Sequence, residues 1–316
     1  MATRGRPFAL LVLLALLALL AAALVVTLTG GDDDATATGS GTATQGEHPI
    51  RIGAKNFTEQ AILGELYRGA LQAKGYEVVL KSDVGSTEII HRALRRGSID
   101  MYPEYVGVLL SEVAELRQRP RSPSAAYAAA QAYEQRNGFA LLEQTPFSDT
   151  NALGVKPAYA KRHGLRTIAD LRRLRGTVRI AALPEFATRF EGLEGLEAVY
   201  GLRNLRAVPV RSGERYAALD SGKADVASVF TTEGQLAGSD YVVLSDPRGL
   251  FASGHVAPIV SPQLRERHGP DVHAAINAVT RTLTTSQMRR MNAAVDQSGR
   301  APAAVAAEFL RAQGLV

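Results

Sequence analysis

Cysteine is absent from all 316 residues of the chain. Without a thiol the protein can form no disulfide, no thiolate zinc site and no cysteine nucleophile. The same absence excludes a lipid anchor of the bacterial lipoprotein type, which is attached through a cysteine.

Enzyme signatures are also missing. The sequence contains no G-x-S-x-G, H-E-x-x-H or Walker loop, and its six histidines are dispersed. We therefore expect a protein that is not an enzyme and that needs no metal or other cofactor.

A concentrated basic surface is a third missing feature. The formal net charge is +5, but no run of basic residues interleaves with aromatic ones, as a nucleic-acid surface would require. We expect no nucleic-acid partner.

The amino terminus carries an export segment. Arg4 and Arg6 precede an unbroken apolar run over residues 7–26, which matches the charged and apolar regions of a signal sequence. The run is also long enough to span a bilayer, for which about 20 residues suffice. Residues 1–30 are thus either a cleaved signal peptide or an uncleaved membrane anchor, and the polar residues 31–48 that follow form a flexible tether. Both alternatives place the protein on the extracytoplasmic side.

The remainder of the chain contains an internal repeat. Residues 50–54 and 178–182 are near-copies of one strand, and each is followed by the pattern Ala-Leu-x-x-Gly-x-x-Asp, at residues 93–100 and 218–225. Each copy is predicted to form strand, helix, strand, helix, strand, which is the order of a doubly wound α/β unit. Such units bind ligands at the carboxyl ends of their strands, so two facing copies make a cleft.

The repeat defines two lobes. We expect lobe I over residues 49–152, lobe II over residues 153–254, and a return to lobe I over residues 255–316. Two crossings between the lobes form a hinge, which is the architecture of a solute-binding protein that closes around its ligand.

Basic residues stand at both predicted cleft edges. Lys55 and Asn56 lie between the first strand and a helix for which Asn56 and Glu59 form a predicted capping box. A helix start favours an anion. Arg189 occupies the matching junction of the second copy and offers a guanidinium fork to a carboxylate. The alternative for Lys55 and Arg189 is an ordinary solvated surface position.

Aromatic residues are expected at the same edges. Tyr105 follows a predicted third strand over residues 99–102, and Phe230 and Thr231 end the corresponding strand of the second copy. Aromatic rings there can face a cation, although most tyrosines at strand ends only pack.

These motifs together resemble those of the glycine betaine, carnitine and choline binding proteins of osmoprotectant ABC importers. The resemblance extends over nearly everything after the tether, and its segments are Ile52–Gln60, Ile62–Glu65, Gly97–Gly107, Asp149–Leu153, Ala182–Arg189, Phe230–Gly234, Ala257–Pro258, Met291–Asn292 and Val305–Leu310. It implies a type II periplasmic-binding-protein-like fold, capture of a small zwitterion, and delivery to an ABC permease with its ATPase by a membrane-associated monomer.

The resemblance also implies a binding site. Such proteins hold a quaternary ammonium group in a cage of tyrosines, to which Tyr105 corresponds. They hold the ligand carboxylate with basic groups, to which Lys55 and Arg189 correspond. Asn151, Phe230 and Gly254 stand where many relatives have tyrosine, and each lost cation–π contact weakens binding by about 0.5–2 kcal/mol. The expected ligand-binding residues are Lys55, Asn56, Tyr105, Asn151, Arg189, Phe230, Thr231 and Gly254. A less methylated amine or another carboxylate is the alternative ligand, and a membrane-tethered sensor of the same fold is the alternative function.

Overall fold

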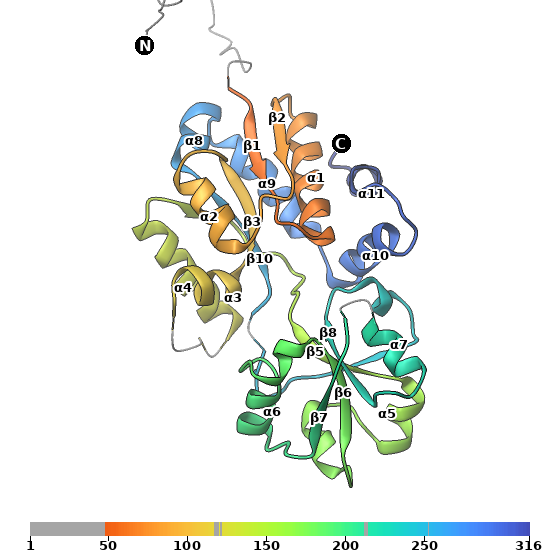
Figure 1. The fold of residues 1–316 in the computed structure, drawn as a ribbon. Coiled ribbons are helices and arrows are strands. Elements are labelled where there is room, and N and C mark those ends of the chain that lie inside the picture. Colours follow the sequence, from red (N-terminus) through yellow and green to blue (C-terminus); the bar gives the residue numbers. More distant parts are fainter. Residues whose placement is uncertain (1–47, 117–119, 121, 212–213, 252) are drawn as a thin grey trace, which may run out of the picture. The chain divides into compact units, whose positions relative to one another are not determined.

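The computed structural model describes residues 48–316 except 117–119, 121, 212–213 and 252 (Figure 1). The predicted export segment lies outside these residues, as does the predicted tether apart from residue 48. No helix of the described part combines the length and apolarity needed to cross a membrane.

The first of two five-stranded sheets has the strand order β2-β1-β3-β10-β4 (Figure 1). Its strands are β1 (Ile50–Gly53), β2 (Val78–Lys81), β3 (Met101–Tyr105), β4 (Ala140–Leu141) and β10 (Val256–Val260). Strand β1 runs parallel to its neighbours β2 and β3, whereas β10 is antiparallel to both β3 and β4.

The second sheet repeats this arrangement with the order β7-β6-β8-β5-β9. Its strands are β5 (Asn151–Val155), β6 (Val178–Ala182), β7 (Leu205–Pro209), β8 (Val226–Phe230) and β9 (Val242–Leu244). Here β6 is parallel to β7 and β8, and β5 is antiparallel to β8 and β9. The prediction of two similar α/β lobes is confirmed.

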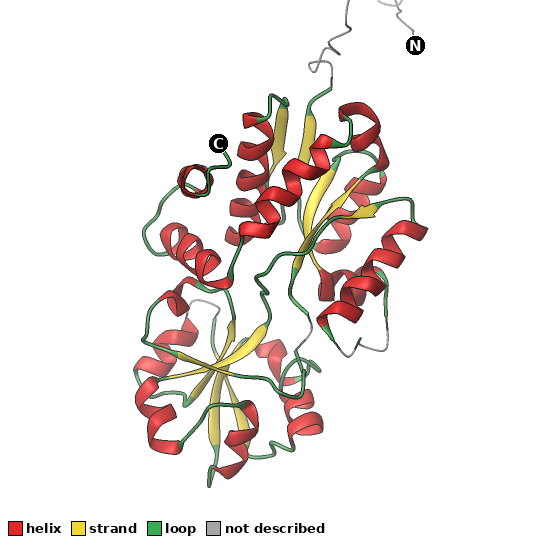
Figure 2. Cartoon of the chain, turned by 180° about the vertical axis from the view of Figure 1, so that it is seen from behind, coloured by secondary structure: helices red, strands yellow, loops and turns green. Residues whose placement is uncertain are grey.

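Helices cover both faces of each sheet (Figure 2). The α-helices are α1 (Thr58–Ala73), α2 (Thr87–Arg95), α3 (Val106–Val108), α4 (Pro123–Arg136), α5 (Pro157–His163), α6 (Leu193–Tyr200), α7 (Arg215–Asp220), α8 (Pro262–His268), α9 (Asp271–Thr282), α10 (Thr285–Asp296) and α11 (Pro302–Ala312). Shorter helical turns are Leu109–Val113, Ile168–Arg173, Pro184–Ala187 and Gly234–Ala237. Alternate residues of β10 enter separate cores, since Val256 and Val260 pack with α1 and α9 while Ala257 and Ile259 pack with α2 and α4.

The residues shared by the two sequence copies make the same ion pair in each lobe. Arg51 Nη2 lies 2.8 Å from Asp100 Oδ1, and its backbone N–H donates to Asp100 Oδ2 at 2.8 Å. Arg179 contacts Asp225 in the same way, at 2.8 Å and 2.9 Å. Each pair ties the start of β1 or β6 to the residue just before the parallel strand β3 or β8, so the repeated Arg and Asp are explained by the fold.

The chain passes between the sheets twice, and the two crossing segments pair with each other. Ser148 and His255 form an isolated antiparallel bridge, and the Asp149 N–H donates to the Gly254 carbonyl oxygen at 2.9 Å. A Cβ on Gly254 would lie 1.7 Å from the Asp149 carbonyl oxygen. Glycine at position 254 is therefore required by the close approach of two backbones.

Two local predictions were wrong. Helix α1 begins at Thr58 with Phe57 as its N-cap residue, and Asn56 is exposed and makes no capping contact. Strand β3 continues through Pro103 to Tyr105, because β10 pairs with it from Met101 to Tyr105. Pro103 suggests the end of a strand, but pairing with the distant strand β10 keeps residues 103–105 extended.

Candidate functional site

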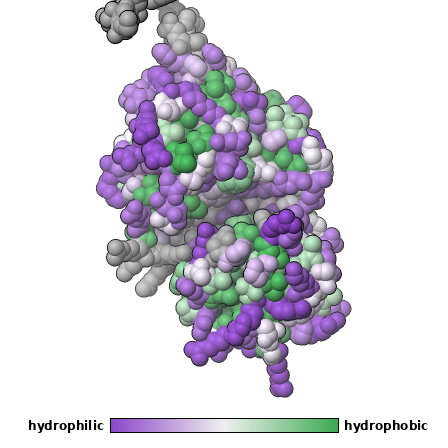
Figure 3. Space-filling view, viewed as in Figure 1, coloured by the Kyte–Doolittle hydropathy of each residue, from purple (hydrophilic) through white to green (hydrophobic). Residues whose placement is uncertain are grey.

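A cavity of about 950 Å³ is lined by residues of both lobes. The carboxyl ends of β3 and β8, the start of α1 and one end of β5 reach it, as do the residues around the Pro184–Ala187 turn. Figure 3 shows hydrophilic and apolar residues interspersed over the face that it draws.

Six of the eight sequence-predicted ligand residues line this cavity: Lys55, Tyr105, Asn151, Arg189, Phe230 and Gly254. Asn56 is exposed and is absent from the cavity wall. Thr231 also lies off the wall, because its hydroxyl accepts from the Thr150 N–H at 3.0 Å and donates to the Ser148 carbonyl at 2.8 Å. Thr231 thus holds a crossing segment onto β8.

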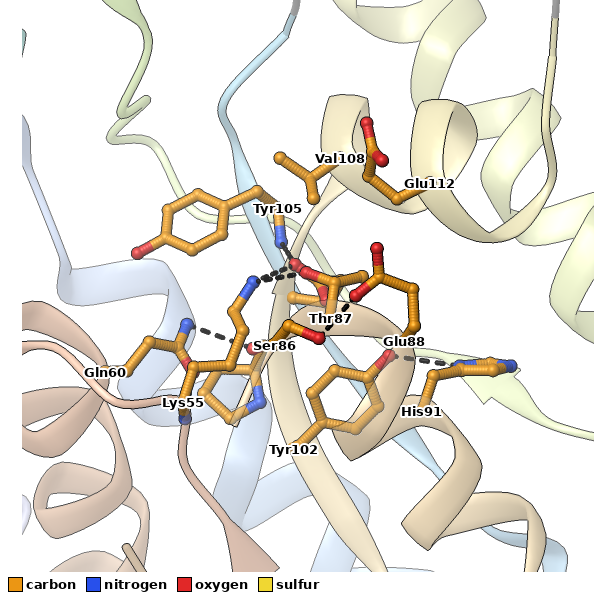
Figure 4. A network of polar contacts seen from close by, with 12 residues as sticks. Lys55, Gln60, Ser86, Thr87, Glu88, His91, Tyr102, Tyr105, Val108 and Glu112 are labelled. Atoms are coloured by element: carbon orange, nitrogen blue, oxygen red, sulfur yellow. Dashed lines mark hydrogen bonds and ion pairs between the residues drawn. The ribbon is translucent and has the colours of Figure 1, made fainter. Parts of the chain in front are cut away.

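The positive charge of Lys55 is paired with a carboxylate inside the protein. Its Nζ lies 2.6 Å from Glu104 Oε1 and 3.1 Å from Thr87 Oγ1 (Figure 4). The lysine is 6% exposed and Glu104 is fully buried. A ligand carboxylate would therefore compete with a buried carboxylate that Lys55 already holds.

The Tyr105 ring is fixed on two sides. Lys55 Nζ lies 4.7 Å from its ring centroid, and its hydroxyl donates to Glu59 Oε1 at 2.8 Å. The Phe57 ring stacks near it, with centroids 6.1 Å apart. Tyr105 is a rigid part of the wall, and one cation, the lysine, already sits against it.

Three phenylalanines expose their rings. Phe57, Phe190 and Phe230 are 44%, 49% and 38% exposed, and all three line the cavity. Partly exposed apolar rings that line a cleft mark a binding surface. Sequence reasoning selected only Phe230 for binding, although Phe57 and Phe190 were recognisable as the aromatic residues beside Asn56 and Arg189.

Two carboxyl groups stand at the cavity wall between the lobes: Glu59, which is buried, and Asp149, which is half-buried with its Oδ1 atom fully covered. Glu59 Oε2 accepts from Asn292 Nδ2 at 2.9 Å, and Asn292 also donates to the Thr232 carbonyl. Burial raises the pKa of Glu59. Burial, followed by the charge of Glu59, raises the pKa of Asp149 well above its usual value, while hydrogen bonding from Thr232 opposes the shift.

The wall formed by lobe II carries its own ion pair. Arg215 pairs with Glu233, which also accepts from the Tyr216 hydroxyl, and the Arg215 guanidinium lies 5.6 Å from the Phe230 ring centroid. Asn151 Nδ2 donates to Glu191 Oε2 at 2.7 Å.

Arg189 is exposed, and no described residue forms a hydrogen bond or ion pair with its guanidinium. Arg189 is the exposed basic group among the residues that line the cavity. Among the described residues, no cluster of three His, Asp or Glu side chains is arranged to hold a metal ion.

Comparisons with known proteins show the family to which the chain is related. The sequence profile described as the substrate binding domain of an ABC-type glycine betaine transport system matches residues 48–312. A glycine-betaine-binding protein of Pseudomonas aeruginosa is 31% identical over 278 residues, 84% of this chain and 88% of that protein. A glycine betaine-binding protein of Escherichia coli is 26% identical over 287 residues, 85% of this chain and 92% of that protein. The crystal structure of a glycine betaine/carnitine/choline ABC transporter protein superposes with a TM-score of 0.78 at 27% identity, covering 84% of this chain and 99% of the other.

Proposed function

We propose that the cavity captures a small quaternary ammonium solute of the glycine betaine, carnitine or choline class. The premise is that this chain belongs to the family of substrate-binding domains of ABC-type glycine betaine transport systems. The chain is the substrate-binding component of such a transporter. Its family acts outside the cytoplasm, which agrees with the export segment of the sequence.

The observation that carries the ligand class is the set of exposed rings. Phe57, Phe190 and Phe230 come from both lobes and face one cavity. A cation over an aromatic ring gains about 0.5–2 kcal/mol. Lys55 Nζ already lies 5.9 Å from the Phe57 ring centroid and the Arg215 guanidinium 5.6 Å from that of Phe230, so a ligand cation adds to, or competes with, these contacts. A quaternary ammonium group is suited to such a site, since it has no N–H to satisfy and its charge is spread over methyl groups.

Capture by lobe closure follows from the same arrangement. The sequence predicts lobe I over residues 49–152 and 255–316 and lobe II over residues 153–254, but Asn151 and Ala152 already pair with β8 in the second sheet. The two lobes are joined by the paired crossing segments. Closure brings Phe190, Phe230 and Arg189 of lobe II toward Phe57 of lobe I. Arg189 then receives the carboxylate of a zwitterionic ligand, a role that a guanidinium fork fits.

The proposal extends to the assembly. The protein works as a monomer, held at the membrane by an uncleaved amino-terminal anchor or released after cleavage, and delivers its ligand to a permease with its ATPase. The apolar run over residues 7–26 supports both modes of export.

Calorimetric titration of the purified protein with glycine betaine, choline, carnitine and unmethylated amino acids tests the function. We expect quaternary amines to bind and unmethylated amino acids to bind at least tenfold more weakly. Phe190→Leu keeps an apolar side chain but removes the ring, and should weaken binding about 2- to 30-fold, which corresponds to 0.5–2 kcal/mol. Val79→Leu, at a 42% exposed position off the cavity wall, is the matched control. A preference for unmethylated amino acids would refute the ligand class.

A further inference from the structure

Asp149 has a carboxyl oxygen without a partner at the cavity wall. Its Oδ1 is buried, and no described residue forms a hydrogen bond with it. Asp149 lies on the crossing segment just before β5, where Thr150 and Thr231 exchange hydrogen bonds and bring Thr232 alongside. A buried carboxyl oxygen without a partner is costly, so the position needs a physical reason.

The neighbouring carboxyl group is better satisfied. Glu59 accepts from the Tyr105 hydroxyl at 2.8 Å through Oε1 and from Asn292 at 2.9 Å through Oε2. Both of its oxygens therefore have partners in the unliganded protein. Of the two carboxyl groups between the lobes, Asp149 is the one with unused capacity.

The basic residues of the cavity do not neutralise this pair. Lys55 is held by Glu104, and Arg215 is held by Glu233. The described lining residues include six carboxyl groups, Glu59, Glu112, Asp149, Glu191, Glu233 and Asp296, and three basic groups, Lys55, Arg189 and Arg215. The cavity has an excess of acidic groups, which suits a ligand that brings a positive charge.

We propose that Asp149 is the counter-ion of the ligand's ammonium group, and that the ligand's charge displaces a proton from the Asp149 and Glu59 pair to solvent when it binds. The assignment rests on the proposed function and adds a specificity-determining residue to it. A quaternary ammonium group donates no hydrogen bond, so its counter-ion acts by Coulomb attraction over several ångströms and does not need an exposed oxygen.

The proton displacement follows from the surroundings of Asp149. The groups that face it are Glu59 from α1, Tyr105 from β3, and Thr232 and Glu233 after β8; burial and the two glutamates favour its protonated form. An incoming cation favours the ionised form. Between the lowered pKa of Asp149 in the complex and its pKa in the free protein, binding releases a proton, and affinity rises with pH by up to about tenfold per unit.

Calorimetry of the purified protein with choline chloride and with glycine betaine, between pH 5.5 and 8, tests this assignment. Each titration is run in phosphate and in Tris, whose ionisation heats differ, so that a released proton appears as a difference in measured heat. For the wild type we expect tighter binding at higher pH and buffer-dependent heats below the pKa of Asp149. For Asp149→Asn we expect binding at least tenfold weaker at pH 8, about 1.4 kcal/mol, converging with the wild type at pH 5.5, with no pH slope.

The control is Asp220→Asn, which makes the same charge change at an exposed carboxylate paired with Lys156 away from the cavity. It should keep the wild-type affinity, slope and heats. Binding by the wild type without proton release would overturn the assignment alone, as would a wild-type slope in Asp149→Asn. Failure of the wild type to bind either ligand would instead refute the proposed function, and the assignment with it. The wild-type heats decide the question even where the variant does not fold.

Discussion

Replacing Lys55 by methionine should destabilise the protein through the carboxylate it leaves behind. Lys55 Nζ and Glu104 Oε1 are 2.6 Å apart, with side chains 6% and 0% exposed. At an effective dielectric constant of 20, unit charges at this distance attract by about 6 kcal/mol, and the cost of removing both from water offsets much of that gain. Removing one partner strands the other, which typically costs about 3–5 kcal/mol.

Urea unfolding of Lys55→Met, Glu104→Gln and the double variant measures the coupling directly. We expect each single variant to lose about 3–5 kcal/mol and the double variant to recover at least 2 kcal/mol of the summed loss. The control is the exposed pair of Lys156 and Asp220, with side chains 38% and 51% exposed, where Lys156→Met should cost less than about 1 kcal/mol. Additive effects at Lys55 and Glu104, or a loss no larger than at Lys156, would refute the reasoning.

The double variant also separates stability from binding at Lys55. It lacks the lysine yet retains the fold, so its ligand affinity reports any direct contact between Lys55 and a ligand carboxylate. Because Glu104 already neutralises Lys55, we expect glycine betaine affinity within about threefold of the wild type, or 0.7 kcal/mol. A larger loss would support Lys55 as a carboxylate ligand, which remains a prediction from the sequence.

Three further variants test other parts of the structure. Gly254→Ala would place a Cβ 1.7 Å from a backbone carbonyl oxygen, so its melting temperature should fall by several degrees, whereas Gly238→Ala, where a Cβ meets nothing within 4 Å, should melt like the wild type. Burial, with a smaller effect of nearby Glu104, raises the pKa of Glu134 to about 7, and neither carboxyl oxygen has a described partner. Between pH 4.5, the pKa of Glu134 in the unfolded chain, and pH 7, the folded protein binds one more proton than the unfolded chain, so its stability falls as pH rises. In urea unfolding, Glu134→Gln should be more stable than the wild type at pH 8, by up to about 3 kcal/mol. At pH 4.5 the variant should show no such gain. Asp100→Asn should cost more in the same assay than Asp225→Asn, because the Asp100 side chain is 2% exposed and the Asp225 side chain 19% exposed; equal losses would contradict this.

The fold was predictable because its pattern appears twice. The repeated strand and the pattern that ends in Asp100 and Asp225 mark the same ion-paired positions in each lobe, and the two sheets have matching strand orders. The errors were local. Asn56 has the composition of a helix cap, yet helix α1 starts two residues later, and Glu59 binds Tyr105 in place of capping.

Much of the site was predictable in position but not in role. Tyr105 and Phe230 were predicted to lie at the cavity because each stands at or just after the end of a predicted strand. The state of Lys55 was not predictable, because its partner Glu104 is 49 positions away on a segment expected to be a loop. The role proposed for Asp149 was not predictable either, because it depends on the charge of Glu59, which acts on Asp149 only in the folded chain.

The Arg51 and Asp100 pair and its copy in lobe II have a consequence for how the protein can change. Each pair lies at the amino ends of its strands, whereas the cavity lies mainly at the carboxyl ends. These two ion pairs are therefore separate from the cavity, although other stabilising residues, such as Lys55 and Gly254, do line it. Substitutions can accumulate around the ligand without loosening either pair, so the scaffold can acquire a new solute, in nature or as an engineered sensor, while its two halves stay folded.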